Sequence, residues 1–190
     1  MERAGHWLPP GAWHACVGEP TFTPGESIWV CVDVGGDRSA TAVVWLNTNH
    51  HVGVWIGHGE EAVLEAVELL RELTERYSVA EVVFDPWRFG QAAVELEREG
   101  LTVVKFPQTD QRMIPASSRL HAAIVSGRIV LPDHDELRQH AANAIARHSR
   151  RGWRIDKASR SDKIDAIIAL CMALARLEDR PERVRLIGSL

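Results

Sequence analysis

Residues 27–46, SIWVCVDVGGDRSATAVVWL, contain the pattern that decides the fold. Residues 27–33 are apolar and rich in β-branched side chains, and a Gly-Gly pair follows them, which is typical of a buried strand that runs into a turn. Residues 41–46 have the same character, and residues 51–56, HVGVWI, repeat it after a short polar turn. Three strands joined by two short connections predict an antiparallel meander.

The pattern changes after residue 60. Apolar residues recur every three and four positions from 60 to 77, which predicts an amphipathic helix. A short apolar strand at 81–85, a helix at 89–99 that stops at a glycine, and a second strand at 101–106 follow. Strand-helix-strand alternation is typical of parallel strands. The sequence therefore predicts an α/β domain whose mixed, mainly five-stranded sheet is first antiparallel and then parallel.

Three further helices are expected in the second half of the chain. Two of them cover residues 111–126 and 136–148, separated by a short apolar segment and a proline. The last covers residues 161–177 and has a continuous apolar face, with Ser161 as the expected N-cap.

The two ends of the chain differ from its middle. Residues 1–26 are rich in proline and glycine and predict an extended lead-in that docks through its tryptophans, whereas residues 179–190 form a charged tail. Residues 27–178 are expected to be one domain, because 190 residues suffice for a single hydrophobic core.

Composition narrows the class of protein. The chain is 45% hydrophobic and 25% charged, as in globular proteins, and it has neither a bilayer-length apolar run nor a secretory signal, so we expect it in the cytoplasm. Its three cysteines are far apart and predict reduced thiols, not a disulfide framework or a zinc ribbon. The net charge of -4 argues against a general nucleic-acid coat, so any DNA contact must be local.

Three aspartates stand where chemistry is expected. Asp33 and Asp85 each end a predicted strand, and Asp165 lies in the first turn of the last helix. Buried carboxylates are costly because desolvation and mutual repulsion disfavour their charges, and a divalent cation removes that cost. Oxygen ligands of this kind suit two Mg²⁺ or Mn²⁺ ions that promote phosphodiester cleavage. Taken singly, an aspartate after a strand is more often only a turn former or a helix cap, so the functional interpretation rests on the three together.

The same segments resemble the nuclease half of phage terminase large subunits. The resemblance runs over about residues 7–178, and its most specific parts are DPW at 85–87 and KID at 163–165. The strand segment WVCVDVGGDRSATAVVW and the lead-in WLPPGAWHAC also match that family.

This resemblance implies a ribonuclease H-like fold and an endonuclease that cuts concatemeric double-stranded viral DNA during genome packaging. By position, Asp33, Asp85 and Asp165 match the family's catalytic, metal-binding acids, while Asp37 and Asp162 stand where some relatives have accessory acids. It also implies the host-cell cytoplasm as the location, and as partners a packaging ATPase domain, a small terminase subunit and a portal. The sequence has no GxxxxGK[ST] loop, so ATP hydrolysis is not expected of this chain.

A basic segment leads into the last helix and predicts a DNA contact. Positive charge concentrated beside an acid cluster brings phosphates to a metal site, although such a run is also found in ordinary solvated loops. Its members are Arg147, Arg150, Arg151, Arg154, Lys157, Arg160 and Lys163.

Two alternatives remain open from the sequence. The fold is shared by junction resolvases, transposases and ribonucleases, so the substrate could differ. A domain with the same sheet and acids could also serve as a non-catalytic module that binds DNA or the portal.

Overall fold

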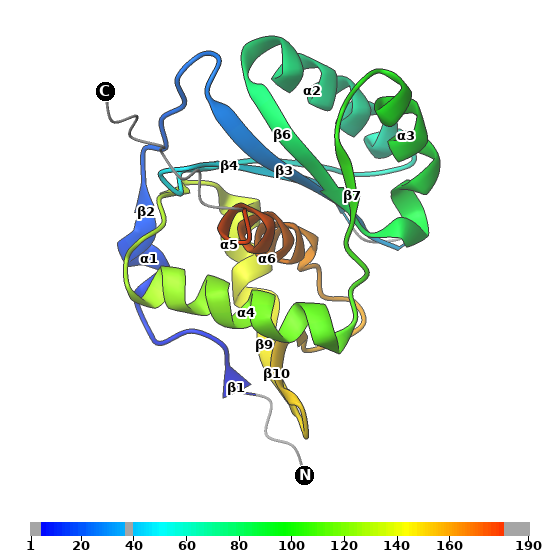
Figure 1. Cartoon of the computed structure of the whole chain (residues 1–190). Coiled ribbons are helices and arrows are strands. Elements are labelled where there is room, and N and C mark those ends of the chain that lie inside the picture. The colour runs from blue at the N-terminus through cyan, green and yellow to red at the C-terminus, as the bar shows by residue number, and fades with distance from the viewer. Residues whose placement is uncertain (1–4, 37–39, 181–190) are drawn as a thin grey trace, which may run out of the picture.

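A five-stranded mixed sheet forms the centre of the molecule, seen in a computed structural model that describes residues 5–36 and 40–180 (Figure 1). Its order is β5-β4-β3-β6-β7, and the strands are β3 (Ser27–Val34), β4 (Thr41–Asn47), β5 (Val52–Gly57), β6 (Ser78–Phe84) and β7 (Val103–Lys105). β3, β4 and β5 pair antiparallel, whereas β3 with β6 and β6 with β7 pair parallel. The predicted change from meander to parallel strands is confirmed.

The two faces of β3 are covered by different helices because side chains alternate along a strand. Ile28, Val30 and Val32 pack in the cluster beneath α2 (Ala62–Arg76) and α3 (Pro86–Arg98). Trp29 and Cys31 face the other side and join the larger core. Asp33 continues the second series, so its side chain faces the layer opposite α2 and α3.

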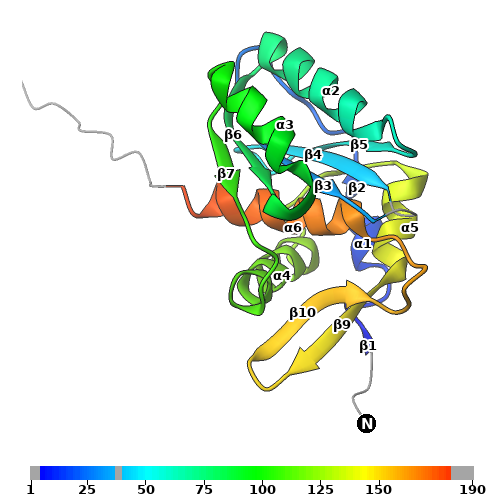
Figure 2. The same ribbon diagram turned by 90° about the vertical axis from the view of Figure 1, so that its right-hand side faces the viewer.

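The layer opposite α2 and α3 is built around α6 (Asp165–Glu178), which lies between the sheet and α4 (Asp110–Val125) (Figure 2). α5 (Asp135–Asn143) packs against α6 as well. Nearly every residue of α6 is buried, from Asp165 to Leu177, which explains why its sequence is apolar on all sides. The predicted last helix is therefore the central helix of the core.

The lead-in packs on this layer, as its tryptophans predicted. Trp7 is buried, and its indole Nε1 donates a hydrogen bond of 3.0 Å to the carbonyl of Ala141. The segment is not wholly extended, because it contains the short helix α1 (Ala12–Cys16) and the two-residue strands β1 (Gly5–His6) and β2 (Val17–Gly18). β2 pairs parallel with β8 (Leu131–Pro132).

The expectation of a helix at 136–148 was wrong at its C-terminal half. α5 ends at Asn143, and the chain then forms an antiparallel hairpin of β9 (Ala144–Ser149) and β10 (Gly152–Lys157). The hairpin is fixed by long-range contacts: the backbone N–H of Ile155 donates to the buried Ser117 hydroxyl at 2.9 Å. A tertiary contact of this kind outweighs the weak local helix pattern.

The last helix also begins later than predicted. It starts at Asp165 with Ile164 at the N-cap position, and Ser161 does not cap it. The reason is a separate turn, in which the Asp162 carboxylate accepts a hydrogen bond of 2.9 Å from the backbone N–H of Ser159.

All three cysteines, Cys16, Cys31 and Cys171, are buried, as expected for core thiols. Among the described residues, we find no helix with the length and hydrophobicity needed to cross a membrane.

Candidate functional site

Asp33 and Asp85 lie side by side at the carboxyl ends of two neighbouring parallel strands. The β3–β6 register pairs Val32 with Phe84, so the next residue along each strand is one of the two aspartates. In β6, Val83 faces the α6 layer and Phe84 faces α2 and α3, so alternation directs Asp85 to the same side as Asp33.

Asp85 also starts α3. Its Oδ1 accepts a hydrogen bond of 2.9 Å from the backbone N–H of Trp87, and Pro86 occupies the first helical position. This arrangement is a common N-cap, and it explains why α3 begins three residues before the predicted start. The helix cap orients the carboxylate, so the structural and the functional interpretation of Asp85 are compatible.

Asp165 completes the group from the opposite layer. It is the first residue of α6, is 9% exposed, and accepts a hydrogen bond of 3.2 Å from the backbone N–H of Ala40 through Oδ2. The buried helix thus brings its N-terminus to the sheet edge where β3 and β6 end.

The three aspartates line one polar cavity of about 260 Å³. The structure therefore brings together residues that are far apart in the sequence and come from β3, β6 and α6. The cavity is also lined by Val34, Gly35, Gly36, Trp87, Arg88, Gln108 and Lys157.

The electrostatics of this cavity disfavour negative charge on Asp33 and on Asp165. Burial, followed by the neighbouring Asp165 carboxylate, raises the pKa of Asp33 from 3.8 to about 8, although a hydrogen bond from Gln108 opposes the rise. Burial also raises the pKa of Asp165, against the hydrogen bond from Ala40. Buried carboxyl groups whose pKa values are raised in this way within a cavity are typical of functional sites.

No ready-made cage of three or more His, Cys, Asp or Glu side chains for one metal ion occurs in residues 5–36 and 40–180. Mg²⁺ does not require such a cage, because it keeps several waters and is commonly held by one or two carboxylates. A set of hard carboxylate oxygens at a polar, partly desolvated cavity fits ions of this class.

The two accessory acids have different outcomes. Asp37 lies outside the described residues. Asp162 does not line the cavity, and its carboxylate closes the turn at Ser159. Nothing in its surroundings supports a metal ligand at Asp162.

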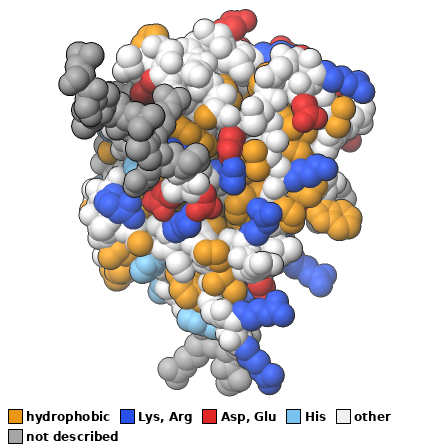
Figure 3. Space-filling view, in the orientation of Figure 1, with side chains coloured by type: hydrophobic (Ala, Val, Ile, Leu, Met, Phe, Trp, Pro, Cys, Tyr) orange, Lys and Arg blue, Asp and Glu red, His pale blue; other side chains and the backbone are white. Residues whose placement is uncertain are grey.

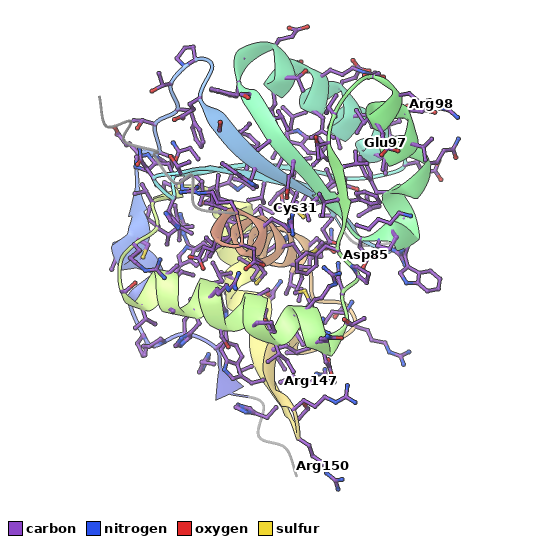
Figure 4. All side chains as sticks on the ribbon, in the orientation of Figure 1. Cys31, Asp85, Glu97, Arg98, Arg147 and Arg150 are labelled. Carbon is purple, nitrogen blue, oxygen red and sulfur yellow. The ribbon has the colours of Figure 1, made fainter. Side chains whose placement is uncertain are left out.

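The basic segment becomes the β9–β10 hairpin and the loop after it. Arg150 and Arg151 form the hairpin turn and are exposed, and Arg147 on β9 is exposed but paired with Asp156 at 2.8 Å. Figure 4 shows Arg147 and Arg150 on the hairpin, pointing away from the body of the protein. In Figure 3, Lys and Arg side chains follow the hairpin along the lower right of the face shown.

The remaining basic residues lie in three different environments. Lys157 lines the carboxylate cavity, and Arg160 and Lys163 belong to the loop that enters α6. Arg154 instead points inward: its Nη1 donates to the carbonyl of Gln108 at 2.9 Å and to Asp110 at 3.2 Å. Arg154 therefore serves the protein interior, contrary to the expected phosphate contact.

Three residues that line the cavity were not identified from the sequence: Trp87, Arg88 and Gln108. Trp87 is 89% exposed beside Asp85, and Arg88 lowers the pKa of Asp33 by its charge. A side chain at Gly36 would lie 2.9 Å from Arg88 Nη1, so the glycine leaves room for this arginine. Trp87 belongs to the DPW segment and Arg88 follows it directly, which is the signal that could have identified both as cavity residues.

Comparison with known proteins gives an independent view of the chain. Residues 55–180 match the family model described as terminase large subunit, endonuclease domain. This range includes Asp85 and Asp165 but begins after Asp33. No curated protein matches the chain.

Solved structures agree on the fold. The large terminase of bacteriophage HK97 superposes with a TM-score of 0.78 at 19% identity, over 92% of this chain and 44% of that one. The large terminase nuclease of thermophilic phage G20c gives 0.73 at 16% identity, over 93% and 99%. The same nuclease with bound magnesium gives 0.70 at 16% identity, over 93% and 99%.

This chain thus spans less than half of the HK97 protein and almost all of the G20c nuclease. The mixed sheet with helices on both faces is the ribonuclease H-like fold that the sequence predicted. Since the family model matches about two thirds of its length, the chain belongs to the endonuclease domain family of terminase large subunits.

Proposed function

We propose that this domain is a divalent-metal-dependent endonuclease that cuts double-stranded DNA, with Asp33, Asp85 and Asp165 as its catalytic and metal-binding residues. The observation that supports it most is the convergence of these carboxylates from β3, β6 and α6 on one cavity. Family membership supports a nuclease, and the G20c nuclease structure with bound magnesium supports a divalent ion.

In this proposal each aspartate is oriented by one fixed donor. Asp33 Oδ1 accepts from Gln108, Asp85 Oδ1 from the N–H of Trp87, and Asp165 Oδ2 from the N–H of Ala40. Among the described residues, the second oxygens of Asp33 and Asp85 have no hydrogen bond to the protein, so they are free to bind a cation.

Two bound Mg²⁺ or Mn²⁺ ions would supply an activated water and neutralise the charge that develops on the phosphate. The chain supplies the carboxylates that hold them, and Lys157 and Arg88 add positive charge to the cavity wall. These two cations attract a scissile phosphate to the cavity. The aspartates repel it until bound cations compensate the charge of the carboxylates.

The cations of the hairpin and of the loop that enters α6 define the proposed DNA contact. Arg147, Arg150 and Arg151 belong to the projecting hairpin, and Arg160 and Lys163 to the loop that leads to Asp165. Phosphate contacts of this type bind DNA with little sequence preference. Arg154 is left out of this surface because its guanidinium is held by Gln108 and Asp110.

Family membership also supports a proposal for the wider setting of the domain. We propose that the domain cuts concatemeric viral DNA during packaging in the host cytoplasm, beside a packaging ATPase domain, a small terminase subunit and the portal. We also propose residues 27–178 as the nuclease domain, with 1–26 as the lead-in and 179–190 as a tail. Residues 181–190 lie outside the described residues.

Plasmid cleavage tests the function directly. Supercoiled plasmid should be nicked and then linearised in Mn²⁺ or Mg²⁺, whereas Ca²⁺ or excess EDTA should give no product. Asp85→Asn should abolish cleavage, and Asp135→Asn, an exposed aspartate on α5, should cleave like the wild type. Cleavage that persists in excess EDTA would rule out the metal-dependent proposal.

Branched DNA and RNA–DNA hybrids distinguish the related activities. Preferential cutting of either substrate would replace the proposed substrate with that of a resolvase or a ribonuclease. DNA binding without cleavage in Mn²⁺ would indicate a non-catalytic module.

A further inference from the structure

Within the described part of the chain, Gln108 is the one neutral side chain that donates a hydrogen bond to a carboxylate of the site. It lies in the loop between β7 and α4, and its Nε2 is 2.7 Å from Asp33 Oδ1. Its other contact is with the buried Met172 of α6, at 3.8 Å from Nε2 to Sδ. Metal binding requires the ionised carboxylate, which only accepts hydrogen bonds, so in that state the amide presents its NH₂ group to Asp33.

The loop that carries Gln108 is itself held from the hairpin. Arg154 on β10 donates through Nη1 to the backbone carbonyl of Gln108 at 2.9 Å and to the Asp110 carboxylate at 3.2 Å. Its side chain is only 20% exposed, so bulk water competes weakly for these bonds. The neighbouring Ile155 N–H, bonded to the buried Ser117 hydroxyl, fixes β10 against α4.

These contacts form a continuous connection from β10 through Arg154 and Gln108 to Asp33. The hairpin that carries the exposed arginines is therefore joined to the carboxylate cavity by two side chains in series. Neither side chain belongs to the hydrophobic core, which includes the buried apolar residues of α4 and α6.

We infer that Gln108 is a positioning residue that fixes the orientation of Asp33 for metal binding, and that Arg154 acts through it by holding the loop. The inference rests on the proposed function, since it assumes that Asp33 binds the metal. Partners of this kind set the orientation of a ligand, and their loss typically lowers metal affinity or activity by about 10–100-fold.

Gln108→Leu tests the inference, because leucine has a similar size and cannot donate a hydrogen bond. The variant should need about tenfold more Mn²⁺, or more, to reach half of the maximal increase in melting temperature. The same rise is expected in the Mn²⁺ concentration that gives half-maximal cleavage. The KM for DNA should stay the same. Gln139→Leu, at an exposed glutamine of α5, is the matched control and should leave all three quantities unchanged.

Arg154→Met provides the second arm and distinguishes positioning from DNA binding. It should raise the Mn²⁺ requirement in the same direction as Gln108→Leu with an unchanged KM for DNA, and Arg154→Lys should restore part of the loss. The double variant with Gln108→Leu and Arg154→Met should raise the Mn²⁺ requirement by less than the two single effects combined, because both residues act on Asp33 through one connection. Arg150→Ala with Arg151→Ala should instead raise the KM for DNA and leave the Mn²⁺ requirement unchanged.

The outcomes separate the inference from the proposed function. If Gln108→Leu and Arg154→Met cleave normally and need no more Mn²⁺ than the wild type, the inference is refuted and the proposed function stands. Absence of cleavage by the wild type refutes the proposed function, and the melting measurement with Mn²⁺ then still decides whether Gln108 orients Asp33. If Gln108→Leu melts far below the wild type in EDTA, the Arg154 variants decide the question.

Discussion

Replacing Asp33 with asparagine should stabilise the metal-free protein at neutral and alkaline pH. Asp33 is 6% exposed, and burial together with Asp165 raises the pKa of its carboxyl group from 3.8 to about 8. A tenfold change in proton affinity corresponds to about 1.4 kcal/mol, so keeping Asp33 ionised above pH 8 costs several kcal/mol, roughly 6 at most. Asparagine removes the charge and keeps an oxygen that can accept the hydrogen bond from Gln108.

The sign of the pH dependence follows from the raised pKa. The folded state binds the Asp33 proton more tightly than the unfolded state, so this stabilisation is fully present below about pH 4 and is lost as pH rises to about 8. In EDTA at pH 8, Asp33→Asn should melt at least about 5 °C above the wild type, since 1 kcal/mol shifts a domain of this size by about 2–4 °C. The difference should nearly vanish at pH 4.

Thermal melting by circular dichroism in EDTA, from pH 4 to pH 9, measures this directly. Asp135→Asn is the control, because it changes an exposed aspartate and should melt within about 2 °C of the wild type. Mn²⁺ should narrow this difference, because a ligand at a hundred times its Kd adds about 2.7 kcal/mol to the wild type only. A variant that melts below the wild type in EDTA at every pH would show that Asp33 is a structural requirement and not a strained ligand.

Three further predictions follow from other parts of the molecule. Arg150→Ala with Arg151→Ala should weaken binding to all DNA sequences, as measured by fluorescence anisotropy. The slope of log affinity against log salt should fall by about 0.9 for each phosphate that the variant no longer neutralises. An unchanged slope would exclude the hairpin turn from the DNA interface. The purified chain should not turn over ATP in a coupled assay, because its sequence has no Walker loop, and turnover abolished by a point change in the chain would contradict this. Burial lowers the pKa of His140 from 6.5 to about 4, so its neutral form stabilises the fold above pH 6.5 and this contribution is lost as pH falls. Between pH 7 and pH 5 the wild type should lose about 2 kcal/mol more in urea unfolding than His140→Gln, and equal losses would show that His140 does not resist protonation.

The strand acids could be predicted because their position depends on local patterns. Asp33 and Asp85 follow apolar, β-branched runs, and parallel strands bring their carboxyl ends to one edge. The helix that carries Asp165 was equally clear from its apolar residues, although its start was displaced by the turn that Asp162 closes. Metal binding by these aspartates stays a prediction.

The rest of the site depends on contacts that a pattern does not reveal. Gln108 reaches Asp33 across 75 positions of sequence, and it lies in a loop with no motif of its own. Arg154 was grouped with the exposed arginines because charge alone does not show which side of a strand faces the interior. The hairpin was missed for the same reason, since the bond from Ile155 to Ser117 that holds it spans 38 positions.

The burial of α6 has a consequence for the genetics of such a nuclease. Several of the buried residues of α6 are small. Ala166, Ala169 and Ala173 are completely buried between the sheet and the outer helices. Larger residues at these positions would overpack the core, typically by about 1–3 kcal/mol, and would displace the helix that carries Asp165. A screen for temperature-sensitive alleles should therefore recover substitutions along this helix, including ones at Ala173, about two turns from Asp165, in clones that still accumulate protein at low temperature. Such alleles would separate loss of DNA cutting from loss of the polypeptide. Under natural selection, the sequence of α6 can vary little, even at positions that carry no functional group.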